Sequence, residues 1–280
     1  MAKTIDKELV IQNKKEAIKQ VNKLLEFYIT EPSGKYLKKA NLISYWLKEY
    51  ARYIDFEDKF EPSRNIAYKR GNVIKVNFGF NVGNEYGGLH YAVVLDNKNE
   101  HRSPVVTVIP LTSFADDKTV HHNSVMLGND IYKMLKVKYD TTLKALEDEE
   151  NEIIKSHAAI NALLSIARNA LDDIKSTDEN DAAHEKMLEV ERCIEKVNLL
   201  DDSWQEKAKH NKQQKEYLDK IGAEIKNMKK GSVALVNQIT TISKMRIFDP
   251  KNAKGVLSGI SLSEENMGKI NNKIKELFVF

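Results

Sequence analysis

The sequence predicts an α+β protein in which a small antiparallel β-barrel is interrupted by a long helical arm. Apolar residues recur at helical spacing before Pro62, and short β-rich runs follow it. The region between Gly128 and Gly222 contains no glycine, as expected for long helices. The β pattern returns after Gly231, so we expect the arm to be inserted into a single β domain.

An N-terminal helical hairpin is predicted over residues 1–62. From residue 5 to 28, and again from 36 to 56, apolar side chains recur every three or four residues, as one face of a helix requires. The segment Pro-Ser-Gly at 32–34 marks the turn between the two helices. We expect the tyrosines and Trp46 of this hairpin to form core rather than a surface that binds a ligand.

Short β-rich runs separated by turn residues follow the hairpin. Three strands are predicted before the arm, NVIKVNF at 72–78, HYAVVL at 90–95 and VVTVIPL at 105–111, and one run after it, SVALVNQITTIS at 232–243. Neither group is large enough for a stable sheet alone, so residues 63–130 and 229–280 are assigned to one β domain. Ser263, followed by two glutamates, predicts the start of a short C-terminal helix.

Two long antiparallel helices, a coiled-coil arm, are predicted over residues 131–228. No proline occurs between Pro110 and Pro250. Apolar residues from Leu135 onward recur at coiled-coil spacing, and the polar run at 175–181 is typical of the turn between the helices. About forty residues per helix would give an arm of roughly 60 Å. Its role stays open between a solvated spacer, a partner or dimer contact and a clamp over substrate.

Composition and charge favour a globular protein of a reducing compartment. The net charge is +3 and the sequence pI is about 8.6, too mild to indicate nucleic-acid binding by itself. The N-terminal residues lack the continuous apolar region of a secretory signal, and no stretch of the sequence resembles a membrane span. The single cysteine, Cys193, cannot form an internal disulfide. We therefore expect a cytoplasmic protein.

Three blocks of the sequence, in a fixed order, carry a family resemblance. They are Arg-Gly-Asn at 70–72 with the glycine-rich loop at 83–91, Thr112 with Ser113 at the end of a strand, and NQITTISK at 237–244. Together they resemble the signature motifs of the MazF/PemK toxin family, which is related to the ToxN/AbiQ branch. The resemblance implies an SH3-like antiparallel β-barrel, as in MazF, PemK and CcdB, with a short C-terminal helix.

The resemblance also implies a function. The chain is expected to be the toxin of a toxin–antitoxin system, an endoribonuclease that cuts single-stranded RNA without a metal or other cofactor. Attack by the ribose 2′-OH would leave a 2′,3′-cyclic phosphate and a 5′-OH end. Growth arrest is the expected outcome, with phage defence as one use. The expected partners are single-stranded RNA and an antitoxin, either a protein or a structured RNA, and a homodimer is left open.

Two positions depart from the family pattern. The loop arginine of the family, which binds phosphate and transfers a proton, is His90 here, and the arginine of the third block is Thr240. Histidine can give or take a proton near neutral pH, whereas arginine stays protonated. The substitution is therefore compatible with catalysis. The alternative is a catalytically inactive module that binds RNA or a partner, with the lost arginines marking the loss of catalysis.

The resemblance and the chemistry of the residues give a set of candidate site residues. The catalytic candidates are His90 as base or acid, with the hydroxyls of Thr112 and Ser113 stabilising charge on the phosphate. Glu85 is expected to orient His90. The candidates for binding substrate are Arg70, Glu85, Tyr86, Tyr91, Gln238, Lys244 and Arg246, with the tyrosines stacking on bases and the cations along the RNA path.

Each candidate also has a purely structural interpretation. The glycines of the loop can simply permit turn conformations, and Thr112 and Ser113 can simply end a strand. The adjacent histidines His121 and His122 do not predict a metal site, because neighbouring residues of a strand point to opposite faces. No metal is included in the predicted site.

Overall fold

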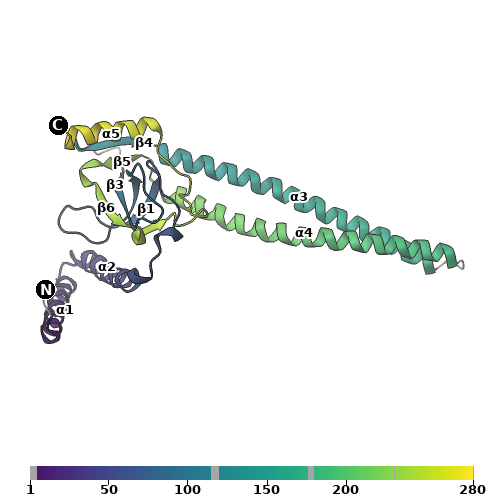
Figure 1. Ribbon diagram of the computed structural model, residues 1–280, viewed down its shortest axis with the longest axis horizontal. Helices are drawn as coiled ribbons and strands as arrows, with labels where there is room; N and C mark the ends of the chain where they lie inside the picture. The colour runs from purple at the N-terminus through teal and green to yellow at the C-terminus, as the bar shows by residue number, and fades with distance from the viewer. Residues whose placement is uncertain (1–4, 115–119, 176–179, 230, 280) are drawn as a thin grey trace.

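The computed structural model describes residues 5–114, 120–175, 180–229 and 231–279. Figure 1 shows a β domain from which two long helices project as an arm, while the two N-terminal helices lie below the β domain in this view. The C-terminal helix covers another side of the same domain (Figure 1). The predicted combination of helices and antiparallel strands is confirmed.

The N-terminal hairpin consists of α1 (Lys7–Thr30) and α2 (Leu37–Phe56), close to the predicted bounds. Asp6 caps α1 by accepting a hydrogen bond from the backbone N–H of Glu8 at 3.0 Å. No residue of α1 is buried, and α2 buries only Ala40. Tyr45 and Tyr50 are 57% and 51% exposed, so the prediction that they form core is wrong.

The strands are all antiparallel neighbours in one sheet, in the order β4-β5-β3-β2-β1-β7, with β6 pairing with β3. Their bounds are β1 (Val73–Asn77), β2 (Leu89–Val94), β3 (Val105–Ser113), β4 (Ser124–Gly128), β5 (Ser232–Leu235), β6 (Thr240–Ser243) and β7 (Ile247–Asp249). The sequence did not predict β4 and β7. It also joined β5 to β6, which a 3₁₀ turn at Val236–Gln238 separates.

The sheet does not close on itself. Over the described residues, the path of paired strands ends at β4 and β7, whereas the sequence predicted a closed barrel. The 3₁₀ turn lets β5 and β6 share β3: residues 111–113 pair with β5, and residues 105–108 pair with β6. The chain before the arm and the chain after it therefore build the same sheet.

Both faces of the sheet are buried, because apolar residues alternate between them along each strand. One face, with Val73, Val93 and Ile109, packs against the base of the arm and the C-terminal helix. The other face, with Ile74 and Ala92, packs against strands and loops of the β domain itself. The second face ends at the glycine-rich loop, where the candidate site lies.

The C-terminal helix α5 (Glu264–Phe278) begins as predicted. The side chain of Ser263 accepts a hydrogen bond from the backbone N–H of Asn266 at 3.4 Å and so caps the helix. Asn266 in turn donates to the backbone of Leu127 at 3.1 Å and to Asp130 at 2.9 Å. The helix is thereby tied to the point where the arm leaves the sheet.

The arm consists of α3 (Asp130–Lys175) and α4 (Asn180–Asn227), with 46 and 48 residues, somewhat longer than the expected forty. At 1.5 Å per residue, each helix is about 70 Å long. The two helices run antiparallel and contact each other along their length, as predicted. The predicted turn at 175–181 lies mostly outside the described residues.

A polar cluster fixes the base of the arm to the sheet. Lys75 on β1 forms a 2.6 Å ion pair with Glu224 on α4, and the hydroxyl of Tyr91 on β2 donates to the same carboxylate. On α3, the ammonium group of Lys138 donates to the backbone oxygens of Val256 and Ser258 at 2.9 and 2.7 Å. Both helices of the arm are thus held by the β domain.

We expect the variant Glu224→Gln to lower the free energy of unfolding by about 2 kcal/mol, because it leaves Lys75 partly buried without a counter-charge. The matched control is Glu150→Gln, since Glu150 pairs with Lys215 on the exposed surface of the arm at 2.5 Å. Such surface pairs contribute less than about 1 kcal/mol. Urea unfolding of both variants measures the difference. Equal losses would show that the cluster does not fix the arm.

Candidate functional site

The glycine-rich loop connects β1 to β2 and has a defined shape. The backbone N–H of Phe78 donates to Gly88 at 2.8 Å, and that of Gly88 donates to Gly79 at 2.7 Å. The side chain of Asn81 donates to the backbone oxygen of Tyr86 at 2.7 Å. Hydrogen bonds between residues of the loop itself therefore define its shape.

The loop is also braced by the third sequence block, which follows the arm. The side-chain oxygen of Gln238 accepts a hydrogen bond from the backbone N–H of Tyr86 at 3.2 Å, and its amide nitrogen donates to Asn84 at 3.4 Å. Gln238 is thus placed to shape the loop. One site is built from segments on both sides of the arm.

The strands β2 and β3 separate beside this loop. Their described pairing ends with Ala92 opposite Pro110, which has no N–H to donate to a ladder. The carbonyl oxygen of the next residue, Leu111, accepts a hydrogen bond from the hydroxyl of Tyr86 at 2.8 Å. Tyr86 therefore bridges the loop and the end of β3.

Tyr86 lies beside both main catalytic candidates. Its ring lies 4.6 Å from the ring of His90, measured between centroids, and its hydroxyl donates to the backbone oxygen of Leu111, the residue before Thr112. His90 lies two residues before Ala92 and Thr112 two residues after Pro110, so the alternation of side chains places both on the same face of the sheet. Both side chains are half-buried.

The environment of His90 favours its neutral form. Burial lowers the pKa of its imidazole, and a hydrogen bond with the backbone of Gly87 opposes this effect only in part. Burial raises the pKa of the Tyr86 phenol, so this hydroxyl keeps its proton. At neutral pH, His90 is therefore able to accept a proton, and Tyr86 is a hydrogen-bond donor.

The lowered pKa of His90 predicts the acid side of a pH profile for RNA cleavage. Cleavage by a neutral imidazole base should fall as the pH drops through the pKa of His90, because the protonated ring cannot accept a proton. Burial places that pKa below the ordinary value of 6.5, so kcat/KM at pH 6.5 should be above half of its plateau value. Rates measured in steps from about pH 5 to 8 check this. A half-maximal rate above pH 6.5 would contradict it.

Three of the predicted substrate-binding residues lie away from His90 and have structural partners. Tyr91 points to the opposite face and bonds to the arm. Arg70 donates to Asn271 on the C-terminal helix at 2.5 Å and to a backbone oxygen beyond the far end of β2. Lys244 is fully buried and donates to the backbone of residues 100 and 101 at 3.0 and 3.4 Å. Burial also lowers the pKa of Lys244.

The remaining candidates lie nearer the loop. Ser113 is exposed at the end of β3, one residue beyond Thr112 and therefore on the other face. Glu85 accepts from the backbone N–H of Val82 at 3.3 Å, and no hydrogen bond joins it to His90 among the described residues. Arg246 donates to the backbone oxygen of Asn77 at 2.8 Å.

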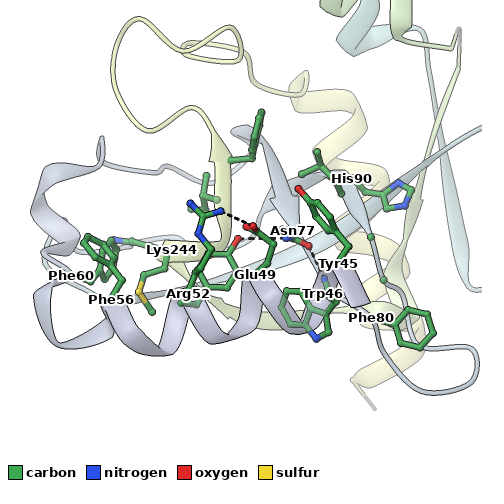
Figure 2. A pocket seen from close by; sticks show the side chains of 18 of the residues that line it. Tyr45, Trp46, Glu49, Arg52, Phe56, Phe60, Asn77, Phe80, His90 and Lys244 are labelled. Atoms are coloured by element: carbon green, nitrogen blue, oxygen red, sulfur yellow. Dashed lines mark hydrogen bonds and ion pairs between the residues drawn. The ribbon is translucent and has the colours of Figure 1, made fainter. Parts of the chain in front are cut away.

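A groove runs from His90 along the side of α2. It has a volume of about 1170 Å³ and lies between α2 and the glycine-rich loop. Figure 2 shows Phe56 and Phe60 at one end, and Phe80 and His90 at the other. Tyr45, Trp46, Glu49 and Arg52 of α2 line it in between. Thr112 is not among the residues that line the groove.

Trp46 packs α2 against the glycine-rich loop. A Cβ atom at Gly79 would lie 2.5 Å from its ring, and Gly79 has a φ of +79°, so only glycine fits there. The guanidinium of Arg246 lies 5.3 Å from the centre of the same ring. The sequence predicted these aromatic residues of α2 as core and not as part of the site.

The structure adds two general findings. Among the described residues, no group of three or more histidine, cysteine, aspartate or glutamate side chains is placed to hold a metal ion. Over the same part of the chain, no helix has a stretch long and apolar enough to cross a membrane.

The antiparallel sheet, the braced glycine-rich loop and the groove beside it together form a small β domain with one candidate site. Residues 69–198 match the family of PemK-like, MazF-like toxins of type II toxin–antitoxin systems. The match confirms the resemblance drawn from the sequence motifs over these residues, which include Arg70, the glycine-rich loop, Thr112 and Ser113. The match leaves out α1, α2 and the strands after the arm. No curated protein matches the chain.

Proposed function

We propose that the protein is a metal-independent endoribonuclease that cuts single-stranded RNA as the toxin of a toxin–antitoxin pair. The observation that carries this proposal is that the ring of Tyr86 packs on His90 and its hydroxyl bonds to the residue before Thr112, beside an open groove in the region similar to PemK-like toxins. A neutral imidazole and a hydroxyl on one face are what cleavage through the 2′-OH needs.

In the proposed reaction, His90 takes the proton of the ribose 2′-OH, and the 2′ oxygen attacks the adjacent phosphorus. The bond from phosphorus to the 5′ oxygen breaks, and this oxygen receives a proton from solvent. The hydroxyl of Thr112 is proposed to stabilise the charge on the nonbridging oxygens, whereas Ser113 lies on the other face of the strand. The products carry a 2′,3′-cyclic phosphate and a 5′-OH end.

Other parts of the proposal follow from the family. The antiparallel sheet is proposed to correspond to the SH3-like barrel, interrupted by residues 131–228, with residues 1–62 as a separate helical unit. The protein is proposed to act on RNA in the cytoplasm, to arrest growth and to be held inactive by an antitoxin. Arg246 and Gln238 remain candidates for contacts with RNA beside the loop.

Incubating the purified protein with cellular RNA in excess chelator tests the enzyme. We expect fragments with 5′-OH ends, which a polynucleotide kinase labels without prior phosphatase treatment. Intact RNA would overturn the proposal. If RNA still bound in a salt-dependent manner, it would support the alternative of a module that binds RNA without cutting it.

A further inference from the structure

The side of α2 that lines the groove is not buried as a hydrophobic core would be. Of its 20 residues, α2 buries only Ala40, although aromatic and apolar side chains make up much of the helix. Tyr45, which lines the groove, is 57% exposed. Large aromatic side chains held open to solvent beside a groove are typical of a binding surface.

The α2 wall is nevertheless held in a fixed place. Trp46 lies against Gly79 in the loop and beneath the guanidinium of Arg246, which itself donates to Asn77. The hydroxyl of Tyr53 accepts a hydrogen bond from the side chain of Asn77 at 3.5 Å. One wall of the groove therefore comes from α2 and the other from the β domain, and these contacts hold the two walls together.

Aromatic residues line the groove from both walls. Tyr45, Trp46 and Phe56 come from α2, and Phe80 and Phe248 come from the β domain. Phe248 is 62% exposed and Phe56 is 49% exposed, so several ring faces are accessible. Flat aromatic side chains recognise nucleobases by stacking, whatever the base.

The charges of the groove decide which part of a nucleic acid fits it. Of the described residues that line it, five carry positive charge and four are carboxylates. Arg52 pairs with Glu49 at 2.8 Å, and Arg64 pairs with Glu61 at 2.7 Å. A nearly balanced lining does not suit a continuous row of phosphates, but it does suit uncharged bases.

We propose that the groove between α2 and the glycine-rich loop binds the bases of single-stranded RNA next to the bond that His90 cuts. This inference rests on the proposed function and extends the substrate site to a helix outside the matched family region. Tyr45 and Trp46 stack on bases. Lys59 and Lys251, which line the groove and form no ion pair with a described residue, contact the flanking phosphates.

The fluorescence of Trp46 tests this directly. The chain has two tryptophans, and the indole N–H of the other, Trp204, has no hydrogen-bond partner among the described residues. The variant Trp204→Phe therefore leaves Trp46 as the single reporter without removing a hydrogen bond. The probe is a mixed-sequence single-stranded RNA with 2′-O-methyl groups throughout, which the proposed reaction cannot cut. We expect it to quench the emission of Trp46.

A pair of variants on α2 separates stacking from folding. Tyr45→Ala should weaken binding of the same probe about 5- to 150-fold, the range that base stacking spans. Leu47→Ala is the control, because Leu47 lies on the same helix, is 39% exposed and does not line the groove. It should bind the probe as the unaltered protein does.

The outcomes of this test are distinguishable from those of the proposed function. Quenching of Trp46 together with intact ordinary RNA would support the groove as an RNA site and overturn the enzyme. Cleavage of ordinary RNA with unchanged Trp46 emission and full affinity in Tyr45→Ala would overturn the groove and keep the enzyme. Quenching by a protein partner alone would also overturn the proposal.

Discussion

The variant His90→Ala is expected to lower kcat for RNA cleavage by about 100- to 10 000-fold, the usual contribution of a general base. His90 is half-buried with a lowered pKa, so its neutral ring is available at neutral pH. The loss should appear mainly in kcat, because the aromatic residues that line the groove are untouched. Rates on a short RNA at saturating substrate measure it.

The control for this variant is His122→Ala, since His122 is exposed and lies in a turn before β4, where its ring is 4.3 Å from the ring of His121. It should cleave RNA at the normal rate. A His90→Ala protein that folds and cleaves within about threefold of the normal rate would show that another group is the base.

The variant Tyr86→Ala is expected to have the second largest effect, on both stability and cleavage. It removes a ring that packs against Phe78 at 5.7 Å and against His90, and a hydroxyl bonded to Leu111. The free energy of unfolding should fall by about 3 kcal/mol. Cleavage should fall as well, because His90 and Thr112 lose the side chain that lies beside them.

The variant Tyr86→Phe separates these contributions. It keeps the ring and loses only the hydroxyl, so we expect a loss of about 1 kcal/mol. In Tyr86→Ala, His90 becomes more exposed to water, and its pKa should rise towards the ordinary value. The acid limb of the pH profile should then move to higher pH in Tyr86→Ala and stay in place in Tyr86→Phe. An unmoved limb in both variants would make Tyr86 purely structural.

Features with a local signal were predictable from the sequence. The helix cap at Ser263, the two helices of the arm and the strands before the arm depend on side-chain pattern and on residues a few positions apart. The family motifs also placed His90 and Thr112 on neighbouring strands. These predictions needed no knowledge of distant contacts.

Contacts between distant segments were not predictable. Gln238 bonds to the loop at Tyr86, and Trp46 packs against Gly79. Both contacts join segments that are far apart in the sequence and depend on the folded sheet. A motif residue such as Lys244 gives no sign in the sequence that its charge is buried on backbone oxygens rather than offered to phosphate. The sequence motifs predicted the candidate residues, and only the structure shows which of them lie beside His90.

The central claim is that His90 and Thr112 face the same phosphodiester of a bound RNA. A crystal structure with an RNA that spans the mapped cleavage site and has a 2′-deoxy group at the cut tests it most directly. We predict the scissile phosphate within about 3.2 Å of both side chains, or one water molecule away. A scissile phosphate bound elsewhere on the protein, out of reach of the imidazole, would contradict the claim.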